Sequence, residues 1–179
     1  GRWVLGDILT EDFFCRGLAN RADCIVMLVE YRRAPEAPFP EPLNDCYSAL
    51  EWIAEYAASF GGDPSRLAVA GTSAGGNLSA AVAMKTRDEH GPNLAHQVLF
   101  VPVIDHNFET DSYRNFSDDY FLTRDSMIYF WDHYVGEGAS GGHPNASPIR
   151  ADSLAGLPPA TIRCAMKGRL MPTLSQPRV

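Results

Sequence analysis

The chain has 179 residues, which is enough for one domain with a sizeable hydrophobic core. It has 45% hydrophobic residues, 21% charged residues and a net charge of −7, an ordinary globular composition without the basic surface that nucleic-acid binding needs. No uncharged apolar run reaches the roughly 18 residues of a membrane-spanning helix, so we expect no transmembrane segment.

The first half of the chain alternates helical and strand patterns. Apolar residues recur at helical spacing over residues 8–22, which predicts a helix. The run CIVMLVEY, residues 24–31, is continuously apolar and predicts a strand buried on both faces of a parallel sheet. Four prolines in residues 32–42 predict an ordered loop, and a second helix is expected over residues 43–60.

The second half continues the alternation. Thr123 is the expected N-cap of a helix that runs to about Tyr134, and residues 105–122 are expected to be irregular. Strands are expected over residues 67–70, 96–104 and 159–165, with a helix from Ala74 to about Arg87. Strands that alternate with helices indicate an α/β fold, with a mostly parallel sheet flanked by helices.

The four cysteines are scattered. Cys15, Cys24, Cys46 and Cys164 include no pair at C-x-x-C spacing, so we expect no metal site. Single cysteines of this kind are typical of small buried apolar residues in a reducing compartment. We therefore predict reduced, buried thiols in a cytoplasmic protein.

The sequence GTSAGG, residues 71–76, places Ser73 where a strand gives way to a helix. A G-x-S-x-G turn of this kind holds the serine in a strained conformation, with its hydroxyl exposed above the sheet. Gly71, Thr72, Gly75 and Gly76 make up the turn, and the N–H of Ala74 would face a developing oxyanion. The alternative is a close-packed or phosphate-binding turn, although a phosphate loop favours a nearby lysine and the next one is Lys85.

Several motifs together carry a family resemblance. VEYRRAPEAPFPEPLND, residues 29–45, resembles the Y-R-L-A-P-E-x-P-F-P loop of the hormone-sensitive-lipase-like (fold-3) carboxylesterases, with Arg33 in place of leucine. FGGDPSRLAVAGTSAGGNLSA resembles their serine turn, and GRWVLGD resembles the end of their H-G-G-G-W-V-x-G motif. NASPIRAD and LAGLPPATIRCA resemble the segment that leads to the strand before their catalytic acid. The likeness covers roughly residues 1–165 and implies an α/β-hydrolase fold.

The resemblance also implies a chemistry. Members of the family it points to hydrolyse esters with a serine, an acid and a histidine, without a metal or another cofactor. Ser73 matches the nucleophile, and the N–H groups of Gly1, Arg2 and Ala74 match the oxyanion hole. The implied substrate is a short- to medium-chain acyl ester. A homodimer is a further expectation.

The triad partners of Ser73 are not evident in the sequence. The family's acid follows the last strand in a D-P-L-x-D-E-G segment, and its histidine comes about thirty residues later. All five histidines of this chain come earlier, and the best substitute is His106, beside Asp105. We therefore expect residues 1–165 to form a partial α/β-hydrolase domain that is inactive as it stands. Residues 166–179 are an atypical tail, which we interpret as the product of a deletion with a frameshift near codon 165.

Three alternatives remain at the level of sequence. The chain could be a non-catalytic ligand-binding homologue of the same fold, a serine peptidase of that fold, or an inert gene fragment. Five aromatic residues could line an acyl or alcohol pocket, or could belong to the ordinary core. They are Trp3, Tyr113, Phe116, Tyr120 and Phe121.

Overall fold

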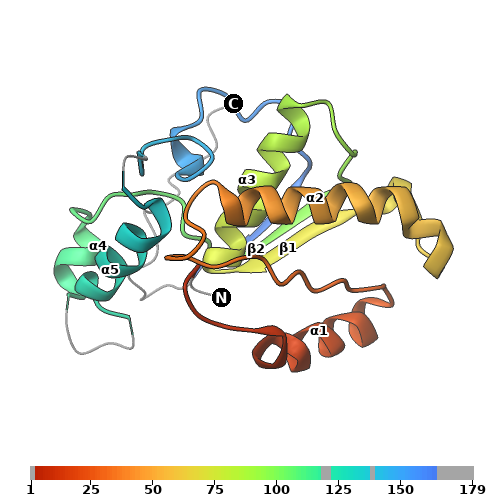
Figure 1. Cartoon of the computed structure of the whole chain (residues 1–179), viewed down its shortest axis with the longest axis horizontal. Helices are drawn as coiled ribbons and strands as arrows, with labels where there is room; N and C mark the ends of the chain where they lie inside the picture. Colours follow the sequence, from red (N-terminus) through yellow and green to blue (C-terminus); the bar gives the residue numbers. More distant parts are fainter. Residues whose placement is uncertain (1–2, 118–121, 138–139, 165–179) are drawn as a thin grey trace.

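A computed structural model of the chain describes residues 3–117, 122–137 and 140–164 (Figure 1). The predicted tail and its boundary at residue 165 therefore lie outside the described residues. The longer helices are α1 (Ile8–Ala22), α2 (Glu41–Tyr56), α3 (Ala74–Asp88), α4 (Asp111–Asn115) and α5 (Arg124–Val135). Short 3-10 helices are η1 (Ala57–Phe60), η2 (Pro64–Arg66) and η3 (Pro148–Arg150).

Three parallel strands form the sheet of the described residues. They are β1 (Ala68–Thr72), β2 (His96–Phe100) and β3 (Ala160–Arg163), in the order β1-β2-β3. Ala68 pairs with His96, and Gln97 pairs with Ala160, so the carboxyl ends of all three strands meet at one edge. The parallel sheet and its flanking helices confirm the predicted α/β fold, in an incomplete form.

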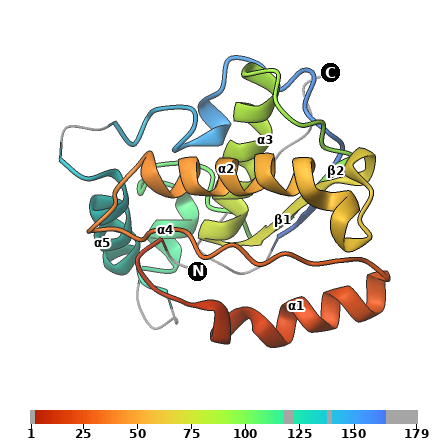
Figure 2. The same cartoon turned by 45° about the vertical axis from the view of Figure 1, so that its right-hand side comes forward.

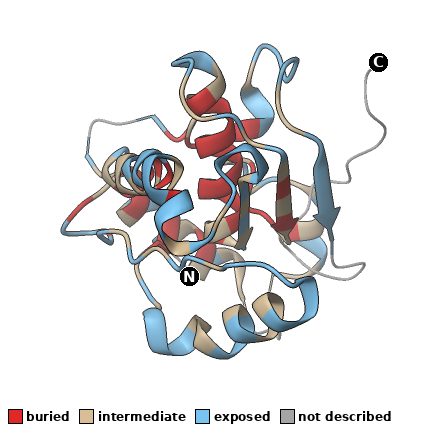
Figure 3. Ribbon diagram, turned by 90° about the vertical axis from the view of Figure 1, so that its right-hand side faces the viewer, coloured by how far each residue is buried: buried red, intermediate tan, exposed pale blue. Residues whose placement is uncertain are grey.

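Helix α3 is the centre of the core. Figures 1 and 2 show α2 and α3 on one side of the strands and α1 on the other. Eleven residues of α3 are buried, mostly small or aliphatic ones, and Figure 3 shows buried residues concentrated along this helix. Trp131 and Tyr134 of α5 pack with Trp3 into the same core, and Trp3 and Tyr134 stack with ring centroids 4.4 Å apart.

Helix α1 has the predicted bounds but is not buried. Asp7 caps it by accepting a 2.9 Å hydrogen bond from the N–H of Thr10, whose hydroxyl oxygen accepts the N–H of Asp7. No residue of α1 is buried, and Leu9 and Phe13 are 84% and 90% exposed. The ring of Phe14 contacts that of Phe100 at the end of β2, with centroids 5.7 Å apart. Local capping therefore sets this helix, with little help from packing.

The strand predicted over residues 24–31 is wrong. These residues run as an open trace between α1 and α2 and join no sheet among the described residues (Figure 2). Ile25, Met27 and Leu28 are exposed. An apolar run indicates a preference for burial, but a strand also needs a neighbouring strand for its backbone hydrogen bonds, and the described sheet places none beside it.

Smaller differences concern element ends. The expected strand 96–104 stops at Phe100, because Val101 takes a φ of 40° and Pro102 has no N–H for the ladder. The expected helix 43–60 begins two residues earlier and tightens into η1. The segment 105–122 contains the short helix α4, capped by Thr110. The cap of α5 by Thr123 is confirmed, since its hydroxyl accepts the N–H of Ser126 at 3.1 Å.

The prediction for the cysteines is only half right. All four are free, but none is buried: Cys24 and Cys164 are exposed, and Cys15 and Cys46 are half-buried. Burial still raises the pKa of the Cys46 thiol to about 12. Among the described residues, no helix is both long and apolar enough to cross a membrane.

Candidate active site

Ser73 occupies a strained turn between β1 and α3. Its φ is 58° and its ψ is −115°, a conformation that residues other than glycine rarely adopt. The N–H of Ser73 donates to the carbonyl of Phe100 at 2.9 Å. Its own carbonyl accepts the N–H groups of Asn77 at 3.0 Å and Val103 at 3.3 Å. The serine is therefore fixed by backbone bonds to its own helix and to the end of β2.

Close backbone contacts explain the small residues of the turn. A Cβ on Gly71 would overlap the backbone of Gly75 and lie 2.7 Å from the nitrogen of Gly76. A Cβ on Gly76 would lie 3.0 Å from the Cβ of Pro102. At Gly75, by contrast, an added Cβ meets no described atom within 4 Å. The turn therefore leaves no room for a side chain at Gly71 and little at Gly76. At Gly75 of the G-x-S-x-G pattern, a side chain would have room.

The first turn of α3 supplies free N–H groups beside the serine. Ala74 is the first residue of this helix, where backbone N–H groups have no partner within the helix. The positive end of the helix dipole lies at the same point. Thr72, the last residue of β1, is exposed. Gly1 and Arg2, the other predicted oxyanion residues, lie outside the described residues.

Val101 is a second strained residue at this edge of the sheet, at a position that the sequence predicts to lie within a strand. It follows β2 as Ser73 follows β1, and its N–H donates to the carbonyl of Arg163 at 2.7 Å. A β-branched residue with a positive φ is an outlier. Only the proline at position 102 signalled that the strand would end here.

His106 is not paired with Ser73. Its ring packs between Phe108 and Trp131, with centroids 5.0 and 4.9 Å away. Burial, with a smaller effect from Arg150, lowers the pKa of this imidazole. Asp105 accepts a 2.7 Å hydrogen bond from Nε of Arg150 and is thus engaged elsewhere. Among the described residues, no histidine ring hydrogen-bonds to Ser73, so the structure does not assemble the Ser73–His106–Asp105 arrangement.

Two of the five aromatic candidates belong to the hydrophobic core. Trp3 and Tyr113 are 1% and 5% exposed and belong to the hydrophobic core. Phe116 is half-buried, and Tyr120 and Phe121 lie outside the described residues. Core packing is therefore the role of the two best-placed rings.

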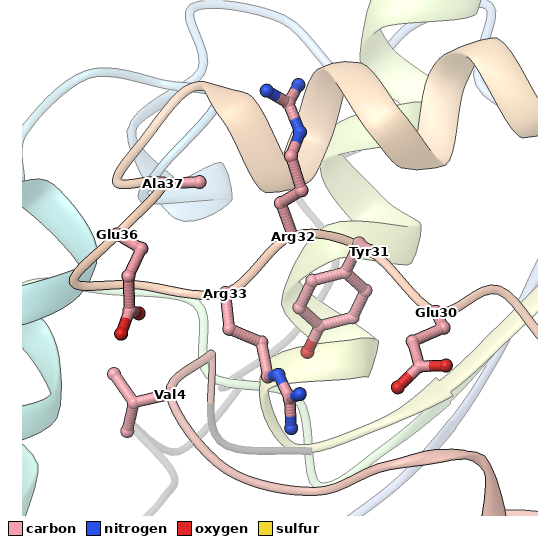
Figure 4. A pocket seen from close by; sticks show the side chains of 7 residues that line it. All are labelled: Val4, Glu30, Tyr31, Arg32, Arg33, Glu36 and Ala37. Carbon is pink, nitrogen blue, oxygen red and sulfur yellow. The ribbon is translucent and has the colours of Figure 1, made fainter.

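An open hollow lies between the N-terminal segment and the proline-rich loop. Figure 4 shows the side chains that line it. Arg32 turns away to α2, where it donates to Glu41 and Asp45 at 2.7 Å, and this bond lowers the pKa of Asp45. The guanidinium of Arg33 donates to the carbonyl of Gly6. Ser73 does not line this hollow. The guanidinium groups of Arg32 and Arg33, which do line it, already have hydrogen-bond partners. The lining residues are Val4, Glu30, Tyr31, Arg32, Arg33, Glu36 and Ala37.

Comparison with known proteins places this arrangement in a family. Residues 1–173 match the alpha/beta hydrolase fold family. The chain is 43% identical over 169 residues to carboxylesterase NlhH of Mycobacterium tuberculosis, covering 92% of this chain and 53% of that protein. It is 40% identical to the carboxylic ester hydrolase LipN of the same species, covering 92% and 46%. The chain thus spans about half the length of the curated relatives it matches.

Solved structures agree with this assignment. A thermostable esterase from Pseudomonas putida ECU1011 superposes with a TM-score of 0.91 at 42% identity, covering 95% of this chain and 54% of that one. A bacterial heroin esterase gives a TM-score of 0.86 at 42% identity, covering 90% and 53%. With its parallel sheet and strained serine turn, the chain belongs to the hormone-sensitive-lipase-like family of α/β-hydrolase carboxylesterases.

Proposed function

We propose that the protein is a serine carboxylic ester hydrolase of short- to medium-chain acyl esters, with Ser73 as its nucleophile. The observation that carries this proposal is the φ of 58° at Ser73, in a turn where a Cβ on Gly71 would overlap the backbone of Gly75. Strain of this kind persists at functional sites because the surrounding structure enforces it. The names of the esterase relatives support the same chemistry.

In the proposed reaction, the Oγ of Ser73 attacks the ester carbonyl carbon and forms a tetrahedral intermediate. The N–H of Ala74 donates to its oxyanion, with Gly1 and Arg2 as further proposed donors. Collapse of the intermediate releases the alcohol and leaves an acyl-enzyme, which water then hydrolyses. A general base must take the serine proton. Because no histidine ring hydrogen-bonds to Ser73 among the described residues, we propose that the 179-residue chain alone is slowed by about 10⁴-fold or more.

The first experiment measures covalent labelling and turnover together. A fluorophosphonate probe and p-nitrophenyl esters of increasing acyl length are applied to the whole gene product and to the 179-residue chain. Ser73→Ala is expected to abolish labelling and hydrolysis. Ser79→Ala, which changes a buried serine within α3, is expected to keep both. Hydrolysis that survives in Ser73→Ala would overturn the proposal.

The same experiment separates the alternatives. A non-catalytic ligand-binding homologue would show no turnover, either as the whole gene product or as the 179-residue chain. Its melting temperature would nevertheless rise when an ester analogue is added. A serine peptidase of this fold would also cleave peptide p-nitroanilides, which an esterase would leave largely intact. We also propose a cytoplasmic location, which four unpaired cysteines support. A homodimer and the absence of nucleic-acid binding stay predictions.

A further inference from the structure

Asn77 is a buried polar residue one helical turn after Ser73. It is fully buried in α3, where the neighbouring buried positions are mostly apolar. Its side-chain nitrogen donates to two carbonyls, those of Val103 and Ala146, each at 2.8 Å. Both partners are acceptors, so the assignment of the amide nitrogen is unambiguous.

The other end of this amide is unsatisfied. Oδ1 of Asn77 is buried and has no hydrogen-bond partner among the described residues. A buried carbonyl without a partner destabilises the fold. The residue is therefore explained by its two donor bonds, which no apolar side chain could make.

These bonds close a ring around the serine turn. Val103 donates its N–H to the carbonyl of Ser73, and its own carbonyl accepts from the side chain of Asn77. The backbone N–H of Val103 is therefore bonded to Ser73, and its carbonyl is bonded to Asn77. Val101, the strained residue that follows β2, lies two positions before Val103.

The second bond extends the ring to a distant segment. The N–H of Ser147, next to Ala146, donates to the carbonyl of His143, and its hydroxyl donates to the carbonyl of Gly141 at 2.6 Å. That hydroxyl also accepts the N–H of His106 at 2.9 Å. Asn77 thus joins the serine turn, the exit of β2 and the 141–147 loop at one point.

We propose that Asn77 is a positioning residue that holds Ser73 in its strained conformation by clamping residues 101–103 and 146 against the first turn of α3. This inference rests on the proposed role of Ser73 as nucleophile. Loss of the clamp lets the serine turn relax, which displaces Oγ from its attacking position. Small displacements of a reacting group slow the chemical step more than they weaken substrate binding.

The test compares Asn77→Ala with Thr86→Val in the whole gene product. Thr86 is a matched control because it is also buried on α3 and also donates to a loop carbonyl, that of Pro92 at 2.8 Å. Both variants remove side-chain donor bonds, but only one lies at the serine turn. Values of kcat are taken per serine titrated with a fluorophosphonate to completion, so that unfolded protein is not counted.

Asn77→Ala is expected to lower kcat about 10- to 100-fold with little change in KM, while Thr86→Val leaves kcat unchanged. If Asn77→Ala is insoluble, Asn77→Ser, which keeps only one donor, is expected to lower kcat by about 10-fold relative to the unaltered protein. An unchanged kcat per titrated serine in the soluble Asn77 variant would overturn the inference. If the unaltered protein is neither labelled nor active, the proposed function has failed instead.

Discussion

Ser73 and Val101 occupy equivalent places at the carboxyl ends of neighbouring parallel strands, and both have positive φ, 58° and 40°. The N–H of Ser73 donates to the carbonyl of Phe100, the residue immediately before Val101. The two strained residues are thus joined through one backbone hydrogen bond. Strain is concentrated at the edge of the sheet where parallel α/β folds place their ligands.

The first prediction tests the strain at Val101. At an ordinary position, replacing alanine with glycine destabilises a protein, but a left-handed φ costs alanine about 1–2 kcal/mol that glycine avoids. We therefore expect Val101→Gly to be more stable than Val101→Ala by about 1 kcal/mol. Urea unfolding of the two variants measures the difference, and this and the next two measurements use the whole gene product, because the 179-residue chain alone is expected to aggregate. An alanine variant as stable as the glycine variant would contradict a positive φ here.

The second prediction concerns the glycines of the serine turn. Gly71→Ala is expected to destabilise the fold by about 3 kcal/mol or more, because its Cβ would overlap the backbone of Gly75. Gly75→Ala is the matched control and is expected to raise stability by up to about 1 kcal/mol, since alanine favours a helix. Equal effects of the two substitutions in thermal unfolding would show that the turn is looser than described.

The third prediction is a pH dependence from His106. Burial lowers its pKa below the ordinary 6.5, and the nearby Arg150 adds to the effect while Asp132 and Asp105 oppose it. The unfolded chain then binds a proton at a higher pH than the folded chain does. Stability is fully present above 6.5 and falls as the pH drops from there toward the folded pKa.

His106→Gln, which cannot take up a proton, is expected to reduce this loss. The measurement is the change in urea midpoint between about pH 7.5 and about pH 5 for the two proteins. His90→Gln is the control, because His90 is exposed, whereas the ring of His106 packs against Phe108 and Trp131. A loss of stability as steep in His106→Gln as in the unaltered chain would assign the pH dependence to other groups.

The fourth prediction concerns the exposed apolar surface of α1 and residues 24–31. Leu9 and Phe13 are almost fully exposed, and Ile25 lies on the neighbouring segment with 52% exposure. We expect the 179-residue chain on its own to bind a hydrophobic dye and to aggregate. Leu9→Glu combined with Phe13→Lys is expected to reduce light scattering at equal concentration. Cooperative unfolding of a soluble monomer by the unaltered chain would contradict this expectation.

Local signals in the sequence predicted the structure best. The N-cap at Thr123 acts within one turn, so the start of α5 could be predicted from sequence. The bounds of α1 followed from the spacing of its apolar residues, although the face they form is not buried. The small residue at Gly71 likewise reflects local contacts with Gly75 and Gly76, whereas Gly76 also packs against Pro102, 26 positions away. The parallel order of the strands agrees with the alternation of elements along the chain.

Errors arose where structure depends on distant partners. The run 24–31 has the composition of a buried strand, but strand formation depends on a neighbour that its own residues do not specify. The clamp of Asn77 joins positions 26 and 69 residues away, and no spacing rule reveals such contacts. The N–H of Val101, which has a positive φ, likewise bonds to Arg163, 62 positions away.

The open trace of residues 25–31 has a consequence for local stability. Their amide N–H groups have no hydrogen-bond acceptor among the described residues, whereas those of β2 are held within the parallel ladder. Amide hydrogen exchange depends on such bonds, and segments that open separately exchange at their own rates. Deuterium uptake should therefore be complete within the first time points over residues 25–31. Deuterium uptake should be slowest over α3. The serine turn is therefore expected to stay folded when residues 25–31 open.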